Sequence, residues 1–269
     1  LSPTMVLASI VSSLLYLLVA FLQYRSIRAN TTLARPTLIT LAAVAIALHG
    51  LSAWYVLQSP EGINLGFFKI SSLIFWIINM ATVISLRWRP LENLLVILFP
   101  LASLSVLVSA LAPGNSSPME SIAPGLLFHI GSSVLAYAVL TIAACQAAVV
   151  SAQDYQLHHR HTIGLVQILP PLELMETMLF EIIWVGLILL TLSIASGMVF
   201  LEDMFAQHLV HKTVLSICAW WVFSILLWGH HQLGWRSQTA ARFTLTGFVV
   251  LMLAYFGSKL VLEVILQRV

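Results

Sequence analysis

Eight long apolar segments recur along this chain of 269 residues and constrain its fold more than any other feature. An apolar helix of about 20 residues crosses a hydrocarbon layer of roughly 30 Å, and it satisfies its own backbone hydrogen bonds there. The sequence therefore predicts an all-α integral membrane protein: about eight transmembrane helices in one bundle, a single polytopic domain over residues 1–269. The segments cover residues 4–24, 37–57, 65–86, 91–112, 125–151, 182–202, 209–230 and 239–263.

The composition excludes several classes of protein. Hydrophobic residues make up 60% of the chain and charged residues 8%, which no soluble globular domain of this length shows. The only two cysteines, Cys145 and Cys218, form no Cys-x-x-Cys pair, so neither thiol redox chemistry nor covalent haem attachment is expected. The sequence contains no phosphate-binding glycine loop and no nucleophile elbow, and nucleic acid is not an expected partner.

The arginines alternate between successive loops and so predict the orientation of the chain. Cytoplasmic loops of membrane proteins carry an excess of Lys and Arg. The loops after the first, third, fifth and seventh segments hold arginine, whereas the loops between them hold acidic residues and no Lys or Arg. We therefore expect a multi-pass membrane protein with both termini outside. The arginines concerned are Arg25, Arg28, Arg35, Arg87, Arg89, Arg160, Arg236 and Arg242.

The longest polar connection, residues 154–180, precedes the sixth segment. Its second half places apolar side chains on one helical face and glutamates elsewhere, a pattern typical of a helix that lies along a membrane surface. The sequence thus predicts a cytoplasmic interfacial helix before the sixth membrane helix. The apolar residues are Leu172, Met175, Met178 and Leu179, and the acidic ones are Glu173, Glu176 and Glu181.

Four histidines lie within or at the ends of the apolar segments. By helical rise, His129, His208 and His211 lie near the outer surface, and His49 lies roughly 12 Å inward from the outer end of its helix. Strongly polar groups are costly in a membrane and tend to be functional. Neutral imidazole is also a common axial ligand of haem iron. These residues therefore indicate a haem site in the outer half of the membrane.

The pair His129 and His211 comes from separate helices at matching depth, as two axial ligands require. His208 precedes His211 by one turn and shares its face, so either of the two can be the second ligand. The alternative is that these residues cap helix ends or form hydrogen bonds between helices. For His49, an interhelical hydrogen bond and a ligand role are both open.

Residues around these histidines fit a haem slot. Small side chains follow His129 and recur near the end of the sixth segment, where they leave room for a planar ligand or for close helix packing. Trp220 is one of several tryptophans able to line the slot, although tryptophan is also common at membrane interfaces. Lys212 is the first choice for a propionate partner. Alternatively, its side chain extends from the helix end to the membrane interface and binds nothing. The small residues are Gly131, Ser132, Ser133, Ala136, Ser193, Ser196 and Gly197.

Short motifs in the second half of the chain resemble the cytochrome c assembly protein family, specifically its CcsA and HemX-like branch of inner-membrane haem-handling proteins. In order, the motifs are Phe128-His129-Ile130 with Tyr137, Leu169-Pro170-Pro171-Leu172, Ser196-Gly197-Met198, His211-Lys212-Thr213, Trp220, Gly234-Trp235-Arg236, Gly247-Phe248 and Tyr255-Phe256-Gly257. Eight-helix members of this family hold haem through histidines near the outer surface. The resemblance implies that role for His129, with haem b as the cofactor and Tyr137 beside it. It also implies that the protein lies in the bacterial inner membrane, so that the outside, where both termini are expected, is the periplasm.

Two departures from the family pattern narrow the expected function. Members that deliver haem to apocytochromes carry a tryptophan-rich external segment before the seventh helix, whereas residues 202–211 contain one Phe and no Trp. The family's last external histidine is also missing, because residues 262–269 contain none. The expectation is therefore a protein that binds, transfers or senses haem for another membrane or periplasmic haem protein, and not a self-contained enzyme.

Two further functions stay open from the sequence. One is a proton-coupled or small-solute transporter without a cofactor, in which His49, Glu202 and Asp203 relay protons. The other is a membrane scaffold for a partner complex, with the interfacial helix near Pro171 as its docking surface. Membrane lipid is also an expected partner, because the chain is strongly apolar.

Overall fold

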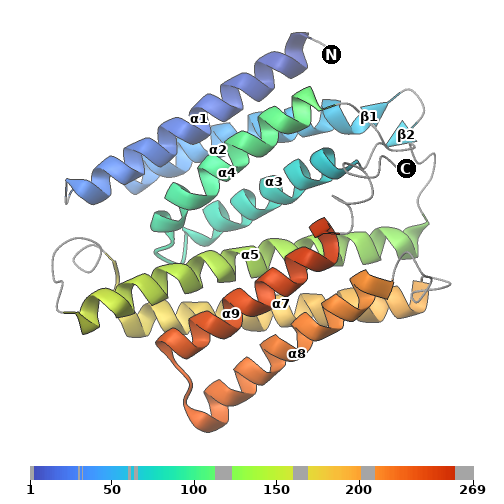
Figure 1. Cartoon of the computed structure of the whole chain (residues 1–269). Helices are drawn as coiled ribbons and strands as arrows, with labels where there is room; N and C mark the ends of the chain where they lie inside the picture. The colour runs from blue at the N-terminus through green and yellow to red at the C-terminus, as the bar shows by residue number, and fades with distance from the viewer. Residues whose placement is uncertain are drawn as a thin grey trace. The chain divides into compact units, whose positions relative to one another are not determined.

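A computed structural model describes residues 3–29, 31, 33–59, 62–63, 66–112, 123–159, 169–200 and 210–257. The chain divides into two compact units, residues 1–121 and residues 122–268 (Figure 1). Each unit contains four long helices. In the described residues, eight helices are long and apolar enough to cross a membrane.

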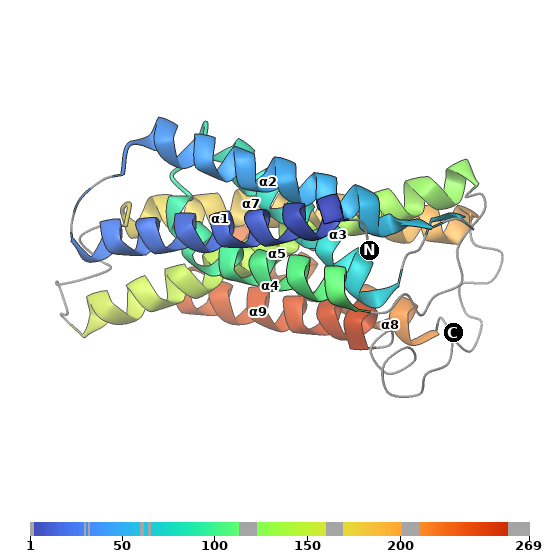
Figure 2. The ribbon, with the colours of Figure 1, turned by 90° about the horizontal axis from the view of Figure 1, so that it is seen from above.

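Unit one is an up-and-down arrangement of four helices (Figures 1 and 2). Helices that follow each other in the chain pack side by side, and α1 also packs on α4, which closes the ring. Two antiparallel strands of two residues each, β1 and β2, lie between α2 and α3, and a 3₁₀ turn at Glu92–Leu94 leads into α4. The elements are α1 (Pro3–Arg28), α2 (Arg35–Leu57), β1 (Gln58–Ser59), β2 (Gly62–Ile63), α3 (Phe67–Ser85) and α4 (Leu95–Leu111).

Hydroxyl groups join the helices of unit one to each other. The Ser9 and Ser52 hydroxyls lie 2.6 Å apart across α1 and α2, and those of Ser13 and Ser103 lie 2.6 Å apart across α1 and α4. All four side chains are buried. Small hydroxyl residues let membrane helices approach closely while each hydroxyl finds a partner. This explains why a strongly apolar unit has polar side chains in its interior.

Unit two contains the second set of four helices, again antiparallel in sequence order (Figure 1). α5 and α8 each pack on both α7 and α9, so α5 and α8 occupy opposite corners of the unit. The start of α5, the end of α7, the start of α8 and the end of α9 lie at the same end of the unit (Figure 1). The helices are α5 (Pro124–His158), α7 (Leu172–Phe200), α8 (Val210–Leu233) and α9 (Ser237–Met252), followed by a π-helical turn at Leu253–Gly257.

The close contact between α5 and α7 depends on Gly186. A Cβ atom at this position would lie 2.4 Å from Cδ2 of Leu140, a side chain that is completely buried on α5. Overpacking of this kind typically costs about 1–3 kcal/mol. We therefore expect Gly186→Ala to lower the free energy of unfolding in detergent by about that amount. Gly131→Ala on α5 is the matched control, because among the described residues no atom beyond the chain neighbours and the local helix backbone lies within 4 Å of the new methyl group, and alanine favours helix. Equal stability of the two variants would contradict the packing argument.

The predicted fold class is confirmed, and the eight predicted segments coincide with the observed helices. Residues 258–263 of the last predicted segment lie outside the described residues. The largest differences at the ends are that α5 continues to His158 and that α7 begins at Leu172. The prediction of a separate interfacial helix is therefore wrong, because its residues form the first turns of α7. Met175, Met178 and Leu179 are buried by other helices of unit two, and the apolar face thus covers protein. The positions of the termini relative to a membrane and the action of both units as one domain stay predictions.

Candidate functional site

His129 lies in the second turn of α5, at the end of unit two where α7 finishes. Its Nδ1 atom lies 2.9 Å from the main-chain oxygen of Ser193 and 3.2 Å from Oγ of Ser196, both on α7. The side chain is only partly buried. The histidine therefore makes a hydrogen bond between helices, which was the alternative to iron ligation. This bond uses only one of the two ring nitrogens, Nδ1.

The partner of Nδ1 determines which nitrogen of His129 carries the proton. A main-chain oxygen can only accept, so Nδ1 must donate its hydrogen to Ser193. In neutral imidazole the other nitrogen then has a free lone pair. Within the described part of the chain, Nε2 of His129 makes no hydrogen bond. This arrangement, with Nδ1–H bound to a carbonyl oxygen and Nε2 unprotonated, is the usual one for a histidine that ligates a metal.

Three serines surround His129 in a connected network. The Ser133 hydroxyl donates to the main-chain oxygen of His129 at 2.7 Å and lies 2.6 Å from the Ser193 hydroxyl. The Ser196 hydroxyl donates to the main-chain oxygen of Ser193 at 2.9 Å. The sequence identified these residues only as small side chains. Their role as hydrogen-bond partners depends on how α7 faces α5, although their proximity to a histidine in an apolar segment was a signal.

Lys212 and Tyr137 both lie beside Tyr255, which is not one of the predicted site residues. The Lys212 ammonium lies 5.5 Å from the centre of the Tyr255 ring, and that ring centre lies 5.3 Å from the centre of the Tyr137 ring. The Tyr137 hydroxyl donates to the main-chain oxygen of Leu251 at 2.8 Å. A positive charge and two aromatic rings thus lie at the same end of unit two as His129.

The other predicted site residues from this part of the chain are Trp220, His211 and His208, and the described ones make no hydrogen bond with His129. Trp220 donates through its indole nitrogen to the Thr191 hydroxyl at 2.8 Å, two residues before Ser193 on α7. His211 opens α8 with an exposed side chain, and among the described residues it has no hydrogen-bond or ion-pair partner. His208 lies outside the described residues. The axial pairing of His129 with His211 or His208 therefore stays a prediction.

His49 belongs to unit one and is completely buried. Its Nδ1 atom lies 3.0 Å from the Tyr16 hydroxyl, and its Nε2 atom lies 2.9 Å from the Ser72 hydroxyl. Both ring nitrogens are therefore engaged in hydrogen bonds between α1, α2 and α3. Of the two roles left open for His49, this is the interhelical hydrogen bond. A ligand role would require one of these bonds to break. Glu202 and Asp203, the other groups of the predicted proton relay, lie outside the described residues.

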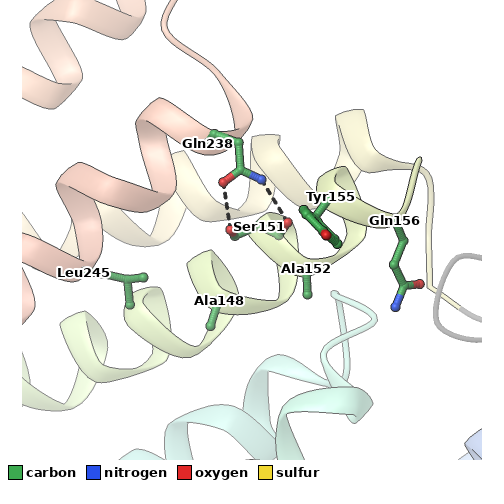
Figure 3. A pocket seen from close by; sticks show the side chains of 7 residues that line it. All are labelled: Ala148, Ser151, Ala152, Tyr155, Gln156, Gln238 and Leu245. Carbon is green, nitrogen blue, oxygen red and sulfur yellow. Dashed lines mark hydrogen bonds between the residues drawn. The ribbon is translucent and has the colours of Figure 1, made fainter. Parts of the chain in front are cut away.

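A groove of about 700 Å³ lies between α5 and α9, and none of the predicted site residues lines it (Figure 3). It begins near Ala148, about 28 Å along the α5 axis from His129. Figure 3 shows Gln238 bound to Ser151 through two hydrogen bonds, each 2.9 Å long. Gln238 also donates to the carboxylate of Asp154 at 3.0 Å. These bonds use both donor hydrogens of the Gln238 amide, so the groove's polar wall mainly joins α9 to α5.

The donor set at His129 fits a haem better than a bare metal ion. In the described residues, no group of three or more His, Cys, Asp or Glu side chains is arranged to hold a metal ion. Haem iron already has four nitrogen ligands from its porphyrin, and the protein needs to supply only one or two axial groups. An imidazole with a free Nε2 meets that requirement.

Comparison with known proteins identifies the family. The family model described as "Cytochrome C assembly protein" matches residues 37–266, so the match extends well beyond the second half of the chain. The chain belongs to this family. The inner membrane protein YpjD of Escherichia coli K12 is 35% identical over 227 residues, which cover 83% of this chain and 86% of that protein. An uncharacterized 28.8 kDa protein of Azospirillum brasilense is 29% identical over 233 residues, or 83% of this chain and 85% of that protein. No solved structure matches the chain.

These comparisons confirm three of the predictions from sequence. The chain is a member of the cytochrome c assembly family, its fold is an all-helical membrane fold, and it is a multi-pass protein of the inner membrane. Membership of an assembly family supports a haem-related membrane function. It also agrees with an accessory protein that is not an enzyme of the usual kind.

Proposed function

We propose that the protein binds haem b near the outer leaflet and handles it for another membrane or periplasmic haem protein. The observation that supports this most directly is the state of His129, whose Nδ1 donates to the Ser193 carbonyl oxygen and whose Nε2 is unpaired among the described residues. In a member of a cytochrome c assembly family, such an imidazole is suited to be an axial ligand. The iron would take its axial bond from this nitrogen.

Neighbouring residues supply the other groups that a bound haem needs. His211 is exposed at the start of α8, at the same end of unit two, and is the proposed second ligand, with His208 as the alternative. The Lys212 ammonium lies over Tyr255 and would balance the charge of a propionate. Trp220 and Tyr137 would contribute apolar surface for the macrocycle, since the polar atom of each already has a partner. The chain's contribution is thus to bind and orient haem, and we assign it no catalytic residue.

The absorption spectrum of detergent-purified protein from haem-replete cells tests this proposal. We expect a Soret band that shifts on reduction with dithionite, with about one haem released per chain in acid extraction. Ligation by two histidines gives a low-spin spectrum, whereas ligation by His129 alone gives a high-spin one. Protein purified from haem-replete cells without a Soret band, and still without one after incubation with hemin, would overturn the proposal.

A further inference from the structure

Ser133, Ser193 and Ser196 form a serine network that extends from the main chain of His129 on α5 to the main chain of Ser193 on α7. Each of its protons can be assigned, because main-chain oxygens only accept. The Ser133 hydrogen goes to the His129 oxygen, so in the Ser133–Ser193 pair the Ser193 hydroxyl must donate. Besides the helical bond within α7, the Ser193 main-chain oxygen then accepts from two side chains, Nδ1–H of His129 and the Ser196 hydroxyl.

We propose that Ser133, Ser193 and Ser196 are positioning residues that set the tautomer and the basicity of His129. The Ser133–Ser193 pair strengthens the hydrogen bond from Nδ1 to the Ser193 oxygen, and Ser196 weakens it. This inference rests on the proposed function of His129 as a haem ligand. The Ser133–Ser193 pair holds α7 at the distance where the carbonyl of Ser193 meets Nδ1. Ser196 weakens the same bond, because its hydroxyl shares that carbonyl oxygen and lies 3.2 Å from Nδ1.

The physical basis is the charge that the hydrogen bond places on the ring. A stronger bond from Nδ1–H to a carbonyl oxygen makes Nε2 more basic, and a more basic axial ligand favours ferric over ferrous iron. Without the Ser196 hydroxyl, His129 would be the only side chain that donates to the Ser193 carbonyl oxygen, and the bond would shorten. Without the Ser133 hydroxyl, α5 and α7 lose their direct side-chain link beside His129, and the bond would loosen.

Two single substitutions therefore have opposite expected effects on the midpoint potential of bound haem. Ser196→Ala should lower the potential, and a tenfold change in the ratio of ferric to ferrous affinity corresponds to about 59 mV. Ser133→Ala should raise the potential and weaken haem binding about 10- to 100-fold, as losses of outer-shell partners of metal ligands do. Ser193→Ala should reproduce the effect of Ser133→Ala on the potential, and the double variant should be no worse than Ser133→Ala, since the bond between the two hydroxyls is lost in each case.

Ser132→Ala is the matched control. The Ser132 hydroxyl donates at 3.1 Å to the same His129 main-chain oxygen as Ser133, but it makes no bond to the described residues of α7. Ser132→Ala should leave the midpoint potential unchanged. Ser133→Thr, which keeps the hydroxyl, should have the potential of the natural protein. Shifts of the same sign in Ser196→Ala and Ser133→Ala, or a shift in Ser132→Ala equal to that in Ser133→Ala, would overturn the inference.

A second measurement needs no haem and separates this inference from the proposed function. Nitrogen-15 NMR of haem-free protein labelled at histidine reports which ring nitrogen of His129 is protonated, with His129→Gln used to assign the signal. We expect Nδ1–H in the natural protein and in Ser196→Ala, and a mixture of both tautomers in Ser133→Ala. Failure to bind haem would contradict the proposed function alone, whereas a predominantly Nε2–H tautomer in the natural protein would contradict the serine network.

Discussion

His129→Ala is expected to reduce bound haem by more than about tenfold, because it removes the ligand itself and loss of an outer-shell partner alone costs about 10- to 100-fold. The fold should tolerate the change. The side chain is only partly buried, and Ser193 and Ser196 keep their hydrogen bond to each other. The Soret absorbance per chain, measured after purification from haem-replete cells, gives the result directly.

Chemical rescue distinguishes a lost ligand from a damaged fold. His129→Gly leaves space where the imidazole was, and added imidazole should restore the Soret band if the ring acts as an axial ligand. His158→Ala is the matched control on the same helix, because His158 is exposed at the opposite end of α5. An unchanged spectrum in His129→Ala would place the haem site elsewhere, and loss of the band in His158→Ala would do the same.

The apolar segments made the fold predictable from sequence, because spanning a membrane fixes the length of each helix. His129 was predictable as a candidate because an imidazole in an apolar helix is rare and costly. Its usable nitrogen was not predictable. That property depends on the Ser193 main-chain oxygen, 64 residues away in the chain, which becomes a partner only when α7 packs on α5.

The start of α7 shows the limit of periodicity as evidence. A helix with one apolar face can lie on lipid or on other helices, and the sequence pattern is the same in both cases. Glu176 resolves the choice in the structure. Its side chain is buried and contacts Arg236 and Ser237, so this face of α7 meets the turn between α8 and α9. No local pattern in the sequence joins residues about 60 positions apart.

Glu176 and Arg236 provide the second prediction of large effect. Nε of Arg236 donates to Oε2 of Glu176 at 2.9 Å, and the exposed side-chain fractions are 59% for Arg236 and 5% for Glu176. The backbone nitrogen of Ser237 donates to Oε1 at 2.7 Å, and the Ser237 hydroxyl bonds to the same oxygen. Ser237 has a φ of 41°, a conformation that costs free energy for a residue with a side chain. The carboxylate therefore holds the strained turn between α8 and α9 against α7.

Removing either partner should have unequal consequences. Arg236→Ala leaves the buried carboxylate with neutral donors only, and breaking a buried ion pair in this way costs about 3–5 kcal/mol. We expect the lower end of that range for Arg236→Ala, because Arg236 is more than half exposed. Glu176→Gln leaves the remaining charge on Arg236, which water can solvate, so its cost should be about 1–2 kcal/mol. Equilibrium unfolding in detergent measures both values.

The ion pair between Arg35 and Glu92 in unit one is the control. Its atoms lie 2.6 Å apart, but the side chains are 45% and 22% exposed, and exposed pairs contribute about 0–1 kcal/mol. Arg35→Ala should therefore cost much less than Arg236→Ala. If the two arginine variants lose equal stability, burial of the Glu176 carboxylate does not determine the cost. If Glu176→Gln costs more than Arg236→Ala, the charge of the carboxylate is itself required to hold Ser237, and the strained backbone outweighs the unpaired charge.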